Sequence, residues 1–185
     1  LPVVDATVVL QEGRGKYASL PYTLRDVAME VDAHVDLNNE RATNVAIHQL
    51  SAKTQHSSVQ ARGKVLEPLT DMELQLRVGV NVYVPEMAYI MPDNLDVQGR
   101  AKGTVNVSAR LNDLLEMNLA KTKLSGDVHL YELAGVLDDM QVASPDMRVA
   151  FELPNTKGYA REVSWAYAKV DYSGLDVALD GMHVE

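Results

Sequence analysis

The chain has no cysteine and very few aromatic residues. Without cysteine, its 185 residues cannot form a disulfide bond, a thiolate metal site or a thiol nucleophile. There is one Phe, Phe151, and one Trp, Trp165. Any apolar surface must therefore come mainly from aliphatic side chains, and the 46% hydrophobic content is enough to supply one.

Positive charge is also in deficit. The formal net charge is −9, and acidic and basic residues are interleaved along the chain rather than grouped. A nucleic-acid-binding protein presents clustered Lys and Arg to the phosphate backbone, and this pattern offers no such cluster. We therefore expect no nucleic-acid partner.

Long apolar runs are missing as well. Residues 87–91 form one of the longest, whereas a transmembrane helix needs about 20 apolar residues. The chain opens at Leu1 without Met and without the basic and apolar regions of a signal peptide. We expect residues 1–185 to be a single β-segment excised from a longer polypeptide.

Strict alternation is the main positive signal. Over residues 72–84, and again over residues 95–111, every second side chain is apolar or Gly. Successive side chains of a β-strand point to opposite faces, so each stretch predicts a long strand with one apolar and one polar face. Because the connection between them is short, we expect the two strands to be antiparallel neighbours.

Similar alternation fills most of the remaining chain, clear at residues 24–37 and weaker at residues 44–53 and 57–66. It occurs at residues 4–10, 24–37, 44–53, 57–66, 120–130, 147–153, 163–167 and 175–179. Turn signals separate these stretches, at Gly13 and Gly15 and at residues 155–158. We expect Pro145 to begin a strand, where a missing N–H is tolerated. Residues 132–137 fit either a helical turn or a bend.

Helix is expected only in two short segments, residues 86–91 and 112–117. Asn112 and Asp113 are predicted to cap the second, because short polar side chains satisfy the free N–H groups of a first turn. The chain therefore predicts an all-β fold: a long, strongly twisted antiparallel sheet with one hydrophobic face, curled into a groove or open half-barrel, with short helical turns at its rim.

Glycine recurs in mid-strand on the predicted apolar face. The positions are Gly63, Gly99, Gly126 and Gly181. Glycine weakens a strand, so its recurrence indicates either a bend or close approach of another group. The alternative is that these residues only let a large sheet coil.

No constellation of residues indicates catalysis. The nearest approach to a ligand cluster is His34, which alternates with Asp32 and Asp36 on a predicted polar face. Such residues are common on any solvated face, and nucleophile-elbow, zinc-protease and phosphate-loop motifs are all missing. We expect no enzyme activity, no metal ion and no cofactor.

The apolar face itself allows two interpretations. In a β-sandwich two such faces cover each other, and the chain would then be a ligand-free structural or adhesive module of a cell-surface protein. In a curled single sheet the face would stay partly open and could take up acyl chains. Periodicity alone does not separate these possibilities.

Five segments, in this order, resemble a known family. They are residues 66–74 (LEPLTDMEL), 84–92 (VPEMAYIMP), 95–104 (LDVQGRAKGT), 111–115 (LNDLL) and 124–130 (LSGDVHL). Over about residues 20–155 the chain is similar to the AsmA-like proteins of Gram-negative envelopes, in particular those of the Bacteroides group. These are related to TamB and to bridge-like lipid carriers with repeated β-groove units.

The resemblance implies a location and a role. It implies a periplasmic segment of a protein anchored to the inner membrane through a segment not present here. Its hydrophobic β-groove would bind or conduct phospholipid or another acyl-chain lipid for inter-membrane transport and outer-membrane maintenance, and other envelope proteins are its candidate protein partners. The candidate groove-lining residues are Val27, Met29, Val31, Val35, Met72, Leu74, Leu76, Val78, Val80, Val82, Val84, Leu95, Val97, Val105, Val107, Leu111, Leu124, Val128 and Leu130.

Overall fold

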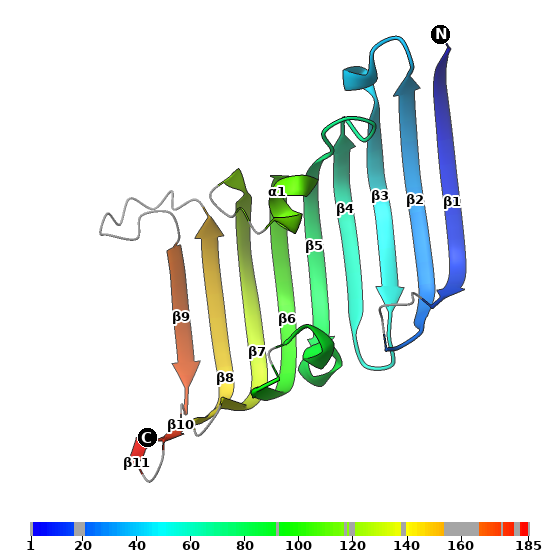
Figure 1. The fold of residues 1–185 in the computed structure, drawn as a ribbon. Coiled ribbons are helices and arrows are strands. Elements are labelled where there is room, and N and C mark those ends of the chain that lie inside the picture. Colours follow the sequence, from blue (N-terminus) through cyan, green and yellow to red (C-terminus); the bar gives the residue numbers. More distant parts are fainter. Residues whose placement is uncertain are drawn as a thin grey trace.

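The strands form a single open antiparallel sheet (Figure 1). The structure is a computed structural model that describes residues 2–16, 21–91, 93–116, 118, 121–137, 140–153, 167–174, 176–179 and 182–184. The strands are β1 (Val3–Gly15), β2 (Leu24–Asp36), β3 (Asn44–Lys53), β4 (Ser58–Leu66), β5 (Glu73–Tyr83), β6 (Leu95–Arg110), β7 (Lys123–Leu137), β8 (Met140–Leu153), β9 (Tyr167–Ser173), β10 (Asp176–Leu179) and β11 (Met182–Val184).

The strand order follows the chain. Strands β1 to β8 are each antiparallel to the next, and β8 then pairs with both β10 and β9 along different parts of its length. Strand β11 pairs with β10. This arrangement confirms the predicted all-β class and the open, unclosed sheet.

The two long alternating stretches are neighbours, as predicted. They correspond to β5 and β6, which pair without interruption from Glu73 opposite Arg110 to Tyr83 opposite Arg100. Val78 lies opposite Val105 in the middle of this pair. The uninterrupted register places the apolar side chains of both strands on one face.

The sheet has no second layer over it among the described residues. In that part of the chain, only Val84 and Ala109 are buried apolar residues, and the buried polar residues are Thr43, Thr122 and Ser144. Most domains bury the apolar face of a sheet against another layer. The described chain is therefore not a two-sheet sandwich.

The predicted turn at Gly13 and Gly15 is wrong, because both residues lie inside β1. The pairing of β1 with β2 shifts between Leu10 and Gly13, and Glu12 there has a φ of 55°. A residue in this left-handed conformation is typical of a β-bulge, which inserts an extra residue without ending the strand.

Residues 132–137 are also strand, neither a helical turn nor a bend. Glu132 has a φ of 52° beside a register shift in the pairing of β6 with β7. The bulge again lets pairing resume, from Ala134 opposite Gln98 to Leu137 opposite Leu95.

Pro145 does not begin β8, which starts at Met140. The β7 register passes from Ser144 opposite Leu133 to Asp146 opposite Tyr131 and leaves Pro145 unpaired. On its other side β8 pairs with β10 as far as Ala143 and with β9 from Asp146. Proline is tolerated here because neither neighbour needs its missing N–H.

Short helices lie at the rims of the sheet: η1 (Glu40–Ala42), which the sequence did not predict, η2 (Val84–Ile90) and α1 (Leu111–Leu115). The expected helical segments correspond to η2 and α1. The predicted cap is wrong, because α1 begins at Leu111 and its N-cap position, Arg110, makes no side-chain cap hydrogen bond. Within the described ranges, no helix is both long and apolar enough to span a bilayer.

Some expected features fall on positions outside the described residues. They are the hairpin turn at residues 155–158, Trp165 and Gly181.

Candidate functional site

The candidate site is the apolar face of the sheet. Cross-strand register joins the alternating residues of successive strands into continuous rows. One row runs through Val8, Val31, Ile47, Gly63, Leu76, Val107, Leu124 and Leu153. A second runs through Leu10, Met29, Leu50, Ala61, Val78, Val105, Gly126, Phe151 and Ala168. The face therefore extends without a polar break from β1 to β8 or β9.

A bulge in β3 preserves this face. Its apolar residues change from odd to even numbers between Ile47 and Leu50. The pairing with β4 shifts at that point, so Ile47 lies opposite Gly63 and Leu50 opposite Ala61. The extra residue keeps the apolar side chains of β3 on the groove face on both sides of the bulge, and His48 and Gln49 remain exposed.

Glycines on this face are fixed by close contacts. Gly63 has a φ of +149°, and a Cβ there would lie 2.0 Å from the backbone oxygen of Gln75. A Cβ on Gly126 would lie 2.5 Å from the Phe151 ring. The only Phe of the chain thus covers a glycine on the neighbouring strand, an arrangement that fills the space left by the missing side chain. These two sites support close approach as the reason for the recurring glycines.

All nineteen candidate lining residues lie at described positions. Those within strands share the apolar face through the registers above. Three lie at the rims: Val84 opens η2 and is buried, and Leu111 donates its N–H to the Met72 carbonyl at 2.8 Å. The candidate set left out residues of the same face on outer strands, although the sequence alternates there too: Val4, Ala6, Val8 and Leu10 of β1 and Met147, Val149 and Phe151 of β8.

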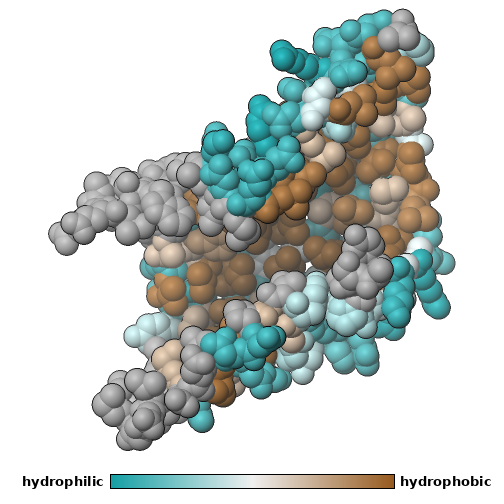
Figure 2. Space-filling view, in the orientation of Figure 1, coloured by the Kyte–Doolittle hydropathy of each residue, from teal (hydrophilic) through white to brown (hydrophobic). Residues whose placement is uncertain are grey.

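The face is hollowed along its length. Figure 2 shows apolar side chains gathered in a band that lies between two polar rims. Val78, Val105 and Val128, on the central strands β5, β6 and β7, are partly buried. At the β1 end the exposure is higher, reaching 47% for Val4. The band is an open apolar groove.

One rim is held by the carboxylate of Glu86 in η2. It accepts a hydrogen bond from the Thr54 hydroxyl at 2.5 Å, one from the His56 backbone N–H at 3.1 Å, and one from the Ser57 hydroxyl. Partial burial opposes ionisation, but these donors hold the pKa of Glu86 below its usual value. Because the donors belong to the connection between β3 and β4, the carboxylate ties η2 to that hairpin.

An aromatic contact adds to this rim. The rings of Tyr22 and Tyr89 meet edge to face with centroids 5.9 Å apart. Burial, together with the neighbouring Tyr89, raises the pKa of Tyr22. The segment before β2 is thereby joined to η2 on the same side of the groove.

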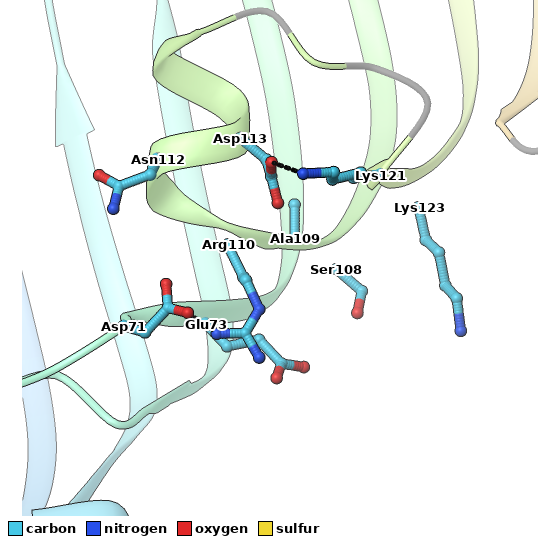
Figure 3. A pocket seen from close by; sticks show the side chains of 9 residues that line it. All are labelled: Asp71, Glu73, Ser108, Ala109, Arg110, Asn112, Asp113, Lys121 and Lys123. Atoms are coloured by element: carbon cyan, nitrogen blue, oxygen red, sulfur yellow. Dashed lines mark hydrogen bonds and ion pairs between the residues drawn. The ribbon is translucent and has the colours of Figure 1, made fainter.

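At the opposite rim, α1 and the ends of β5, β6 and β7 border an open depression of about 560 Å³ (Figure 3). Its charges largely neutralise one another: Arg110 pairs with Asp71, and Lys121 lies 3.7 Å from Asp113. Glu73 and Lys123 complete a lining in which cations and carboxylates are balanced. This depression has no net charge that would select an ion.

The outer face is covered by cross-strand polar pairs. Asp32 accepts from the Thr7 hydroxyl at 2.6 Å and contacts His48 Nε2 at 2.7 Å, and these hydrogen bonds lower the pKa of Asp32. His34 Nδ1 lies 2.7 Å from Asp5. Polar groups on this face are therefore matched by partners in the same sheet.

The predicted ligand-like trio of Asp32, His34 and Asp36 does not converge on one point. The first two have separate partners, and Asp36 accepts from the Asn38 backbone N–H at 2.8 Å. No group of three His, Cys, Asp or Glu suited to a metal ion occurs among the residues that the structure describes.

In comparisons with known proteins, no family model, no curated protein and no solved structure matches this chain.

Proposed function

We propose that this chain is a non-enzymatic, AsmA-like segment of a Gram-negative envelope protein, which holds the acyl chains of phospholipids or similar lipids along its apolar groove. In this proposal the segment lies in the periplasm, belongs to a protein anchored in the inner membrane, and contributes to lipid movement between the two membranes and to maintenance of the outer one.

One observation carries the proposal. The apolar rows are continuous from β1 to β8 or β9, and only two apolar residues of the described chain are buried. Large exposed apolar patches on a protein mark sites of interaction. A groove whose lining is mostly Val, Leu, Met, Ala and Gly suits a ligand that is itself long, flexible and aliphatic.

The energetics favour recognition of the acyl chain over recognition of a head group. Burying a methylene contributes about 0.8 kcal/mol, so a long acyl chain has several times the driving force of a polar contact worth about 1 kcal/mol. The open depression beside α1 carries balanced charge. We therefore propose broad selectivity for lipids with long aliphatic chains.

The test is a charge placed in the middle of the groove. Val78 lies on the apolar face between Ala61 and Val105. We expect Val78→Asp to fold, because its carboxylate can reach water in the empty groove, and to lose most of its capacity to load fluorescent phospholipid from vesicles. The matched control is Asn81→Asp, an isosteric change that adds the same charge to the outer face of the same strand.

Both variants are compared with the parent after circular dichroism has established that they fold. Selective loss of loading in Val78→Asp supports the groove. Equal loading by all three proteins, or no loading by the parent, would contradict it and favour a ligand-free structural module.

A further inference from the structure

Two arginines lie directly opposite each other on the outer face of β4 and β5. Arg62 pairs with Arg77 in the antiparallel register, and both residues are exposed. Like charges directly opposite each other on two strands destabilise a sheet. The chain carries a net charge of −9, yet the next residue in this row, on β6, is the uncharged Asn106. A bound anion would remove the repulsion between the two arginines.

Neither arginine has a partner within the described part of the chain. Arg62 and Arg77 make no side-chain hydrogen bond and no ion pair there. The other arginines of strands β2 to β8 all have one: Arg25 with the Thr54 carbonyl, Arg100 with the His56 carbonyl, Arg110 with Asp71, and Arg148 with Asp127. Arg62 and Arg77 are therefore an exception to the polar matching of the outer face.

The surroundings of the pair are also positive. The ionisable side chains at the outward positions of β4, β5 and β6 are the cations Arg62, Lys64, Arg77, Arg100, Lys102 and Arg110, and the carboxylates Glu73 and Asp96. The regular part of the β1–β2 pair differs, because its outward positions carry Asp5, Glu30, Asp32 and Asp36 with no Lys or Arg. Positive charge on this acidic chain is thus concentrated on the central strands of the outer face.

A shallow depression of about 590 Å³ lies beside the pair. Arg62, Arg77 and Asn106 line it, together with Gln75 and Ser108 from the next outward row of the sheet. Amide and hydroxyl groups can each donate a hydrogen bond. The described lining therefore combines two guanidinium groups with three neutral donors and contains no carboxylate.

We propose that Arg62 and Arg77 together bind a phosphate or phosphate monoester group in this depression, with Asn106 as a further donor. A guanidinium group presents parallel N–H donors that match two oxygens of a phosphate. The terminal oxygens of a phosphate monoester can bridge two such groups, whereas one guanidinium group already engages both oxygens of a carboxylate. The site lies on the face opposite the groove, so the inference does not depend on acyl-chain binding.

The first experiment titrates the intact chain with inorganic phosphate by isothermal calorimetry at low ionic strength, where attraction between charges is least screened. Acetate is the carboxylate probe, and we expect it to bind at least about tenfold more weakly than phosphate. Arg62→Gln and Arg77→Gln should each weaken phosphate binding at least about tenfold. Arg41→Gln removes the same charge from an exposed position in η1 and should leave the affinity unchanged.

A second variant tests the site while keeping every arginine. Asn106→Asp places a carboxylate opposite Arg77, where it competes with phosphate for the guanidinium group and repels the anion. We expect a loss of affinity similar to that of Arg77→Gln. Circular dichroism first establishes that all variants fold as the parent does.

Vesicles distinguish the two sources of a phosphate monoester. Flotation compares phosphatidylcholine vesicles that contain phosphatidic acid, a monoester lipid, with vesicles of phosphatidylcholine alone. Binding to phosphatidic acid that requires both arginines assigns the site to a lipid head group. Phosphate binding in solution without such vesicle binding assigns it to a soluble phosphate ester.

A parent that binds no phosphate up to about 10 mM would overturn the proposal. So would equal affinities of the parent, Arg62→Gln and Arg77→Gln, since the ion would then bind elsewhere. Equal binding of acetate and phosphate would also overturn it and would indicate a surface that attracts any anion, including the acidic side chains of a protein.

Discussion

The two faces of this sheet are made by the same strands, yet their side chains find different kinds of partner. On the outer face, charged and polar groups find partners on the next strand, as when Arg148 donates to Asp127 at 2.8 and 2.5 Å. On the groove face, Val78 and Val105 meet other apolar side chains, but no described layer covers them. The polar groups of the outer face are thus satisfied by one another and by water. The groove face, in contrast, leaves apolar surface exposed on which an apolar ligand can bind.

Glycine substitution should separate the two faces by the largest effect. Gly63 lies on the groove face, where an added Cβ would meet the Gln75 backbone oxygen at 2.0 Å. Gly79 lies on the outer face of the next strand, where the nearest such atom, the Gln60 oxygen, is 4.0 Å away. We expect Gly63→Ala to reduce the free energy of unfolding by about 2–4 kcal/mol. Gly79→Ala should leave it unchanged or raise it by less than about 1 kcal/mol.

Chemical denaturation of both variants checks this expectation. If both variants lose a similar amount of unfolding free energy, the close approach of the Gln75 backbone to Gly63 does not limit which residue fits there.

A charge on each face should give the next largest difference. Val105→Asp removes an apolar side chain from the groove but leaves the carboxylate within reach of water, so we expect a loss of about 1–2 kcal/mol. The neighbouring Asn106→Asp adds the same charge to the outer face, opposite Arg77, and should cost less than about 0.5 kcal/mol.

Urea unfolding of the lipid-free proteins measures these losses. Under a covering layer, the buried carboxylate in Val105→Asp would cost several kcal/mol. Complete unfolding of this variant would therefore contradict an open groove.

Removing the charge of Glu86, at the rim between the two faces, should lower the free energy of unfolding. In Glu86→Gln the amide keeps one acceptor oxygen, but its NH2 group replaces the other, so at least one of the three donors loses its acceptor. We therefore expect a loss of about 1–2 kcal/mol at neutral pH. Glu40→Gln, at an exposed position in η1, should cost less than about 0.5 kcal/mol.

The pH dependence follows from the lowered pKa of Glu86. Its contribution to stability is fully present above the unfolded value and is lost as pH falls through the lower folded value. The difference between parent and Glu86→Gln should therefore shrink in acid, and thermal denaturation across this range measures it. A difference that grows in acid would contradict the hydrogen-bond assignment.

An outer-face ion pair should have the smallest effect. The Arg148 guanidinium lowers the pKa of Asp127, but the pair is exposed, and exposed pairs contribute little. Arg148→Gln should lower the melting temperature slightly at low salt and not at all at high salt, because ions screen the attraction. A loss as large as that of Glu86→Gln, or one that persists in high salt, would contradict this ranking.

Alternation was enough to predict the strands and their faces, because a side-chain period of two is a direct consequence of strand geometry. Together with the short connection between the two stretches, it predicted the pairing of β5 with β6 and the common face of Val78 and Val105. It failed at bulges, since Glu12 and Glu132 adopt positive φ without the glycine or asparagine that usually signals it. Those bulges turned one predicted turn and one ambiguous segment into continuous strand.

The covering of the apolar face could not be predicted from the sequence. A Val or Leu at every second position satisfies a sandwich and a groove equally well, since both demand one apolar face. The difference lies in whether another part of the chain packs on that face, which depends on long-range arrangement and not on any local residue. The charged depression around Arg110 and Asp71 was likewise invisible, because it forms where α1 folds back beside the strand ends.

The most direct test of the groove is its content. The intact chain, purified without detergent, is extracted with organic solvent, and the extract is analysed by lipid mass spectrometry. We predict phospholipids or other long-chain lipids in stoichiometric amount, and their loss from Val78→Asp purified in the same way but not from Asn81→Asp. An extract free of such lipids, from a parent protein that also fails to load lipid from vesicles, would contradict the proposal that the open apolar face binds acyl chains.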